Sequence, residues 1–354
     1  MLERIKIKGY KSIQNLDLEL GPINVFIGSN GVGKSNLISF FKLVNKIYEG
    51  KLQEYSLVSG VDNLLYYGRK NSSEIYGYLD FGNNGYTFTL KPSEEDTFFI
   101  SLEESIYFHA PRNPSFFTSN MKESGIKKSN TRRDTYLRDH LKSYKIYHFH
   151  DTSSNAPLRS KVNVEDNREL KEDGSNLAAY LYYLQEIHPI NFMRIEKVIE
   201  SVVPFFDSFA LSPSLISKGN ILLEWKEKKQ PEFYFNANHL SDGSLRFIAL
   251  VTLLMQPELP KVIIIDEPEL GLHPIAIVKL SALLKSAASK KCQIIVSTQS
   301  VTLLNNFEPE EIITVDREDN QSVFRRLEAE ALGQWLSEYS IGELWSKSII
   351  KGQP

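Results

Sequence analysis

The stretch "INVFIGSNGVGKSNLISFFKLVNKIY", residues 23–48, decides the fold expected for this chain. Its first five residues form a continuous apolar run, which is typical of a fully buried strand. Residues 28–35 contain three glycines and end in Lys34-Ser35, after which the apolar residues recur at helical spacing. The stretch therefore predicts a buried strand, a glycine loop and a helix.

The loop fits the pattern G-x-x-x-x-G-K-[ST], which predicts a phosphate site. Glycine permits the tight turns that aim backbone amides and a helix N-terminus at an anion. Lys34 would then neutralise the β- and γ-phosphates of a nucleotide, and the Ser35 hydroxyl would ligate Mg²⁺. The alternative is a glycine-rich turn that contains Lys-Ser by coincidence. The predicted nucleotide-binding residues of the loop are Ser29, Asn30, Gly31, Val32, Gly33, Lys34, Ser35 and Asn36.

A second acidic motif follows another apolar strand pattern, "KVIIIDEPELGLHP" at 261–274. Ligands of open α/β sheets bind at the carboxyl ends of the strands, where Asp266 and Glu267 are expected. We predict that Asp266 is an outer-sphere Mg²⁺ ligand and that Glu267 orients and deprotonates the water that attacks the γ-phosphate. The alternative is an acidic cluster that stabilises the start of the helix at Pro274.

Working outward, the patterns divide the chain into three segments. Residues 1–109 carry the glycine loop and successive antiparallel strand patterns, and residues 216–354 alternate helix and strand, which is typical of a parallel sheet. Residues 110–215 are rich in turn formers and charge before helical periodicity returns, and we predict a mostly helical insertion there. The fold class expected is α/β, with a largely parallel core sheet and an antiparallel β subdomain.

Composition excludes several classes of protein. The chain has 354 residues, 42% of them hydrophobic, which is enough for a sizeable core. A net charge of -3 argues against a dedicated basic nucleic-acid binder, and no apolar window is long enough to span a membrane. One cysteine, Cys292, and an N-terminus without a signal-peptide pattern lead us to expect a cytoplasmic protein with an inert core thiol.

These motifs together resemble a family. The phosphate loop, "LSDGS" at 240–244 and the strand ending in Asp266-Glu267 resemble the head of an ATP-binding-cassette ATPase of the RecF and SMC type. More narrowly, "LSDGSLRFIALVTLL", "IIIDEPELGLHP", "IIVSTQS" and "IGELW" are similar to the stand-alone bacterial ATPases of the AAA-15 and AAA-21 class. The resemblance covers about 1–110 and 220–350.

The resemblance implies that two copies sandwich two ATP molecules. Ser241, Asp242 and Gly243 of one copy would then contact the γ-phosphate held by the other, in addition to starting a helix. His273 would lie near the dimer seam, with a helix-preceding histidine as the equal alternative. Lys11 in "GYKSI" matches a basic residue that such heads carry near the phosphates, with a plain surface lysine as the alternative.

Gln299 stands where transporter cassettes carry a histidine that senses the γ-phosphate. An amide donates and accepts hydrogen bonds but carries no charge, so we expect slow or partner-dependent hydrolysis. The resemblance implies a switch in DNA-linked work, such as anti-phage defence or genome maintenance, with a separately encoded nuclease or toxin as effector. A non-hydrolysing scaffold and a transporter ATPase subunit are the alternative functions.

Two further features stay open at this level. Residues 122–145 hold eight Lys or Arg against three acids, which makes them the best candidate DNA or partner surface, with a solvated helix face as the alternative. "YHFHD" at 147–151 places His148, His150 and Asp151 close together, but without the spacing of a zinc site we favour a structural role.

Overall fold

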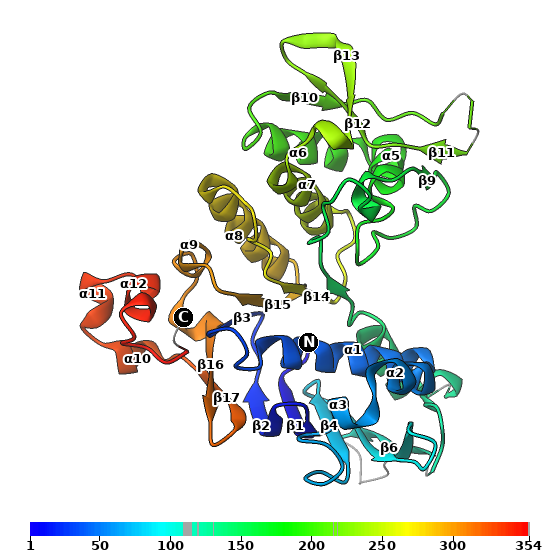
Figure 1. Ribbon diagram of the computed structural model, residues 1–354, viewed down its shortest axis with the longest axis vertical. Coiled ribbons are helices and arrows are strands. Elements are labelled where there is room, and N and C mark those ends of the chain that lie inside the picture. Colours follow the sequence, from blue (N-terminus) through cyan, green and yellow to red (C-terminus); the bar gives the residue numbers. More distant parts are fainter. Residues whose placement is uncertain (109–114, 119, 130, 215, 218, 353–354) are drawn as a thin grey trace. The chain divides into compact units, whose positions relative to one another are not determined.

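The computed structural model describes residues 1–108, 115–118, 120–129, 131–214, 216–217 and 219–352 (Figure 1). The chain splits into two compact units. Unit 1 comprises Met1–Ile146, Pro260–Asp266 and Lys291–Pro354, and unit 2 comprises Tyr147–Leu259 and Glu267–Lys290. The chain passes from unit 1 to unit 2 at 146–147, inside the predicted insertion 110–215, so the units and the predicted segments have different limits. Residues 110–114, 119, 130 and 215 of that insertion lie outside the described residues.

Unit 1 begins with an antiparallel sheet. Strands β1 (Arg4–Tyr10) and β2 (Ile13–Glu19) form the expected hairpin, in which Ile5 lies opposite Leu18. The alternating pattern of both strands buries one face of the hairpin and leaves the other polar. The sheet order is β2-β1-β4-β5-β6-β7, and its remaining strands are β4 (Ile75–Asp80), β5 (Asn84–Pro92), β6 (Phe98–Tyr107) and β7 (Ser115–Thr118).

The second sheet of unit 1 has the order β17-β16-β3-β15-β14-β8. Strands β3, β15, β14 and β16 run parallel, as the alternation of helix and strand predicts, and only the hairpin partner β17 is antiparallel to its neighbour β16 among the pairings described here. All residues of β3 and β15 are buried, which agrees with the apolar runs within their sequences. The strands are β3 (Ile23–Ile27), β8 (Ile146–Tyr147), β14 (Val262–Asp266), β15 (Gln293–Thr298), β16 (Ile312–Glu318) and β17 (Gln321–Arg326).

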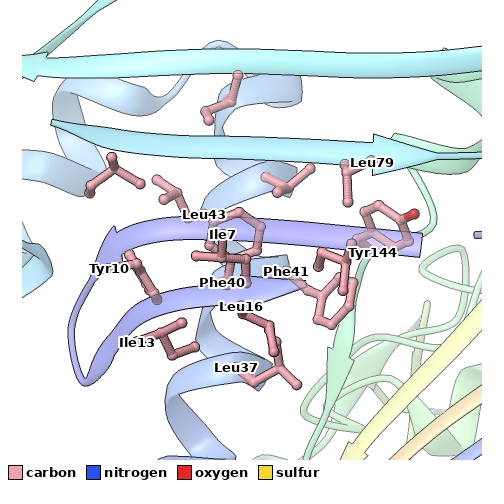
Figure 2. Packing of buried hydrophobic residues seen from close by; sticks show 14 of the residues in the cluster. Ile7, Tyr10, Ile13, Leu16, Leu37, Phe40, Phe41, Leu43, Leu79 and Tyr144 are labelled. Atoms are coloured by element: carbon pink, nitrogen blue, oxygen red, sulfur yellow. The ribbon is translucent and has the colours of Figure 1, made fainter. Parts of the chain in front are cut away.

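Helix α1 (Lys34–Glu49) follows the glycine loop and buries its apolar face in the core of unit 1. Figure 2 shows its side chains Leu37, Phe40 and Phe41 among residues of the β1-β2 hairpin. The ring of Phe40 meets Tyr10 edge-on with centroids 5.3 Å apart, and Phe41 meets Tyr144 in the same way at 5.2 Å. Such edge-to-face pairs add to the free energy of burial, so the helix that starts at the loop is held firmly.

Further helices complete unit 1. Near the C-terminus, the backbone amide of Gly342 in α12 donates to Asn305 Oδ1 at 2.7 Å, which joins α12 to the end of α9. The helices are α2 (Leu52–Ser59), α3 (Val61–Leu64), α4 (Arg132–Leu141), α9 (Val301–Leu304), α10 (Ala329–Leu332), α11 (Trp335–Glu338) and α12 (Ile341–Ser346), with 3-10 turns at Ile126–Lys128 and Pro309–Glu311.

Unit 2 packs four helices against one another and against small sheets (Figure 1). Trp225 is fully buried between the rings of Phe206 and Phe235, which anchors the three-stranded sheet β10-β12-β13. The helices are α5 (Leu177–Ile187), α6 (Pro189–Glu200), α7 (Asp242–Met255) and α8 (Pro274–Ser289). The strands are β9 (Val162–Asn163), β10 (Phe206–Phe209), β11 (Asn220–Ile221), β12 (Glu224–Glu227) and β13 (Gln230–Asn236), and 3-10 turns lie at Pro157–Arg159 and Ala237–His239.

The predicted insertion contains helices α4, α5 and α6, joined by short strands, turns and loops in the part that the structure describes. Within the described ranges, no helix combines the length and the apolar character that a membrane crossing needs.

Candidate nucleotide site

The glycine loop lies between β3 and α1, as the sequence predicts. Gly31 and Gly33 have φ values of 81° and 116°, a region that favours glycine over every other residue. A Cβ at Gly33 would lie 2.0 Å from the Ser322 hydroxyl oxygen, so this close approach also requires glycine. Helix α1 begins at Lys34 with no side-chain cap and no acidic residue in its first turn. This helix N-terminus therefore suits an anion.

The Lys34 side chain is buried and folds back over the loop. Its Nζ donates to the carbonyl oxygens of Gly28 at 2.5 Å and Ser29 at 2.9 Å. Ser35, the next residue, is exposed at the first turn of α1. The loop thus brings a cation, a hydroxyl and helix amides to one place, which is the donor set that a nucleotide polyphosphate with Mg²⁺ requires.

Asp266 ends β14 at the same edge of the sheet. It lies opposite Ser297 of β15, whose hydroxyl donates to Asp266 Oδ1, and β15 in turn pairs with β3, the strand that leads into the loop. Parallel pairing of these three strands places their carboxyl ends together, so Asp266 and the glycine loop share one edge. Over the ranges described, no cluster of three or more His, Cys, Asp or Glu could hold a metal ion. A Mg²⁺ ion here would take its oxygen ligands from Asp266, Ser35 and the nucleotide.

Gln299 follows β15 and contacts the loop directly. Its Nε2 donates to Asn30 Oδ1 at 2.7 Å, across 269 residues of sequence. The amide predicted to stand at the γ-phosphate position therefore lies next to the glycine loop.

Lys11 lies at the turn of the β1-β2 hairpin with a φ of 48°, and its Nζ donates to Ser39 Oγ of α1 at 2.9 Å. Burial and the neighbouring Lys42 lower the pKa of this ammonium. The side chain lines a cavity of about 440 Å³ beside the start of α1. The other lining residues are Ser12, Asn36, Ser59, Asn63, Leu64, Leu65, Tyr67 and Arg317.

One wall of this cavity is formed by the aromatic ring of Tyr67 and the guanidinium of Arg317. Arg317 Nη2 donates to the Tyr67 hydroxyl at 2.7 Å, and that hydroxyl donates to the carbonyl of Asn320 at 3.1 Å. Such a wall can stack on a nucleobase. Sequence reasoning missed both residues, because they are 250 positions apart and neither belongs to a motif.

Glu267 is the first residue of unit 2 after Asp266, and it is half-buried. Its φ of 46° is left-handed, which is unusual for a residue with a side chain, and the amide of Leu270 donates to its carbonyl at 3.2 Å. Backbone conformations of this kind cost about 1–3 kcal/mol and occur often at functional sites.

The segment "LSDGS" at 240–244, called the signature segment below, leads into α7 in unit 2. Ser241 is the N-cap residue, and its Oγ accepts from the amide of Ser244 at 3.1 Å. A Cβ at Gly243 would lie 2.4 Å from the carbonyl oxygen of Gly271, so only glycine allows the loop after Glu267 to lie against the helix. Ser241 and Asp242 are exposed at this helix N-terminus, where the resemblance requires them. His273, also exposed, caps α8 by accepting from the amide of Ile275 at 3.3 Å.

Two arginines of unit 2, Arg246 and Arg159, form hydrogen bonds near this segment. The sequence did not single out either of them. Arg246 of α7 donates to the carbonyl oxygens of His150 at 2.6 Å and Leu270 at 2.8 Å. Arg159 donates to Asp242 at 2.9 Å. No sequence motif marks these bonds, since they join residues up to 96 positions apart.

Several cations of the basic stretch 122–145 have structural contacts. Lys122 pairs with Glu95 at 2.8 Å, Lys127 lies over the ring of Tyr48 at 4.9 Å from its centroid, and Arg138 donates to the Ser129 carbonyl at 2.6 Å. Contacts of this kind agree with the alternative of a solvated charge run that stabilises the surface helix. In "YHFHD", the backbone carbonyl of His150 accepts from Arg246 and the backbone amide of His148 donates to the carbonyl of Glu172.

The chain matches known proteins along most of its length. Residues 23–305 match the family model AAA_21, described as AAA domain, putative AbiEii toxin, Type IV TA system. The OLD nuclease of Thermus scotoductus (strain ATCC 700910 / SA-01) is 24% identical over 371 residues, which cover 97% of this chain and 68% of that protein.

Solved structures share the fold. An SMC head bound to the C-winged helix domain of ScpA has a TM-score of 0.55 at 17% identity, with 93% of this chain and 99% of that chain covered. The SMC head domain with an extended coiled coil bound to the C-terminal domain of ScpA, from Pyrococcus furiosus, has a TM-score of 0.55 at 16% identity, with 95% and 98% covered. The expected fold class is confirmed by the likeness to SMC heads, and the chain belongs to the AAA_21 family.

Proposed function

We propose that the chain binds ATP with Mg²⁺ at the glycine loop, hydrolyses it, and associates with a second copy while ATP is bound. The main support for this proposal is that Lys34, Asp266 and Gln299 lie at one edge of the second sheet of unit 1. Phosphoryl transfer needs positioned charge more than a covalent nucleophile, and this edge offers a cation, a carboxylate and an amide.

In this proposal each residue has a separate task. Lys34 and the first turn of α1 hold the phosphates, and Ser35 and Asp266 hold the metal ion, which neutralises the charge that develops on the phosphates. Lys11, Asn36, Tyr67 and Arg317 hold the nucleoside in the cavity of about 440 Å³. Glu267, which directly follows Asp266 in sequence, accepts the proton of the attacking water.

Ser241, Asp242 and Gly243 supply the second half of the site from another copy. Support comes from the start of α7, where Ser241 and Asp242 are exposed at a helix N-terminus, the kind of helix end that can bind an anion. ATP would thus hold two copies together, and hydrolysis would release them. His273, exposed on the loop before α8, would lie near the same seam.

We infer the biological process of this ATP-dependent switch from the names of the related proteins. One relative is named a nuclease, and the family description includes a toxin, so a DNA-linked task such as anti-phage defence or genome maintenance fits, with a nuclease or toxin as effector. The basic stretch 122–145 is the candidate DNA or partner surface.

Steady-state ATP hydrolysis, measured with and without DNA, tests the enzymatic part. The control is Glu267→Gln, which keeps the side-chain volume but removes the base, and Glu258→Gln is a matched exposed carboxylate in unit 2. Turnover by the parent and by Glu258→Gln, with a loss of at least about a hundredfold in Glu267→Gln, supports hydrolysis. If the parent turns over ATP no faster than Glu267→Gln, both with and without DNA, hydrolysis is excluded and the non-hydrolysing scaffold is the remaining function. The uncharged Gln299 favours that alternative.

Light scattering tests the association. Glu267→Gln with ATP and Mg²⁺ should show twice the mass of one chain, and Ser241→Arg in that background should remain a monomer, because a bulky cation replaces the small hydroxyl at the interface. A single-chain mass for Glu267→Gln at saturating ATP contradicts the proposed dimer.

A further inference from the structure

The side chain of Arg159 lies in the interior of unit 2, with 6% of its surface exposed. All of its described partners belong to the same unit. Its Nε donates to the Thr152 carbonyl at 2.9 Å, and its Nη1 donates to the Ala237 carbonyl. Its Nη2 donates to the Leu240 carbonyl at 3.2 Å and to Asp242 Oδ1 at 2.9 Å. A single guanidinium therefore holds three carbonyl oxygens and one carboxylate.

These partners lie on both sides of Ser241. Ala237 belongs to the 3-10 turn and Leu240 is its C-cap residue, so both precede Ser241, and Asp242 is the first residue of α7. The planar guanidinium offers five donors in a fixed arrangement, whereas a lysine offers three donors from one point. Arg159 thus fixes the direction in which the chain enters α7, and with it the direction of the Ser241 hydroxyl and of the amides of the first turn.

Asp242 creates an electrostatic problem at this position. Its carboxylate is 64% exposed at the N-terminus of α7, where the proposed function requires an incoming phosphate. Two anions at one helix end repel each other, which offsets the attraction of the helix amides for the phosphate. The buried Arg159 cation in contact with Asp242 balances this charge.

We propose that Arg159 is a positioning residue for the signature segment, which neutralises Asp242 and orients Ser241 so that this helix end accepts the γ-phosphate held by a second copy. The inference rests on the proposed function and adds to it a residue outside every motif. Arg159 acts through Asp242 and the turn.

ATP-dependent dimerisation in the Glu267→Gln background tests this inference, with light scattering over a range of ATP concentrations. Arg159→Gln should raise the ATP concentration for half-maximal dimerisation about tenfold or more, because a buried partner of the carboxylate is lost. In the double variant Arg159→Gln/Asp242→Asn no uncompensated carboxylate remains. The logarithm of its ATP concentration for half-maximal dimerisation should therefore return at least halfway to that of the background protein. Arg194→Gln, an exposed arginine of α6, is the matched control and should equal the background protein.

Two measurements separate positioning from folding. Binding of a fluorescent ATP analogue to the monomer should be the same in all variants, because the glycine loop belongs to unit 1. Asp242→Asn alone, whose amide oxygen still accepts from Arg159, should keep the fold and dimerise within about twofold of the background. If Arg159→Gln does not fold, the Asp242→Asn variant is used in its place. A loss of dimerisation in Asp242→Asn then overturns the inference.

The remaining outcomes are also decisive. A background protein that dimerises, together with an Arg159→Gln variant equal to Arg194→Gln, overturns this inference and leaves the proposed function standing. Failure of the double variant to recover shows that Arg159 only stabilises the turn, which likewise overturns the charge-balancing role. A background protein that stays monomeric with ATP overturns the proposed dimer, and this inference with it.

Discussion

The side-chain amide of Gln299 donates a hydrogen bond of 2.7 Å to Asn30, and so joins the end of β15 to the glycine loop. This bond places an uncharged donor beside the loop that we propose to hold the γ-phosphate. A neutral amide stabilises the charge of a transition state less than a cation does, which is why we expect slow hydrolysis.

Replacing Gln299 by leucine should therefore slow the chemical step rather than weaken binding. We expect the kcat of Gln299→Leu to fall about tenfold or more, with the affinity for ATP changed by less than about threefold, because the phosphates keep Lys34 and the α1 amides. Steady-state kinetics with equilibrium nucleotide binding separate the two effects. Gln334→Leu, an exposed glutamine of unit 1, should show no change in either quantity, and a loss of affinity alone in Gln299→Leu contradicts the assignment.

Lys34→Met should abolish nucleotide binding. The substitution keeps an unbranched side chain but removes the ammonium that lies on the Gly28 and Ser29 carbonyls, so we expect affinity for ATP to fall by about a hundredfold or more. Titration with a fluorescent ATP analogue measures this. Lys46→Met, in the last turn of the same helix, removes only a pair with Glu49 and should bind like the parent. Equal binding by both variants would exclude Lys34 from the site.

Gly243→Ala should destabilise unit 2. The new Cβ would lie 2.4 Å from the Gly271 carbonyl oxygen, so the helix and the loop after Glu267 must separate. Overpacking of this kind costs about 1–3 kcal/mol, which lowers the melting temperature by several degrees in a unit of this size. Calorimetry of Gly243→Ala beside Gly21→Ala checks this, because a Cβ at Gly21 meets nothing nearer than 3.7 Å. Equal melting temperatures for the two variants would show that the loop moves without cost.

Cys292 provides a pH-dependent test of the core. Burial raises the pKa of this thiol from 9.0 to about 12. The raised pKa means that the folded state favours the neutral thiol, so this contribution to stability is complete below pH 9 and is lost as the pH rises toward 12. A thiol reagent at pH 8 should label the folded protein far more slowly than the denatured protein, because only the exposed thiolate reacts. Since Cys292 is the single cysteine, the absorbance reports one site, and rapid labelling of the folded protein would contradict its burial.

Local patterns predicted much of the architecture because they reflect rules that hold within a few residues. The apolar run before Gly28 marks a buried strand, glycine at 31 and 33 marks left-handed backbone, and helical spacing after Lys34 marks α1. The strand ending in Asp266 follows from the same rules. The limits of the compact units could not be predicted in this way, since they depend on which distant segments pack together.

The sequence by itself determined the phosphate loop, the acidic strand end and the helix start at Ser241, because each is a short motif whose geometry is set by local backbone preferences. Only the tertiary structure decided that Gln299 meets Asn30, that Tyr67 and Arg317 share a cavity wall, and that Arg159 binds Asp242. These contacts join residues 83–269 positions apart. Their specificity comes from strand pairing and packing in three dimensions, which no local pattern records.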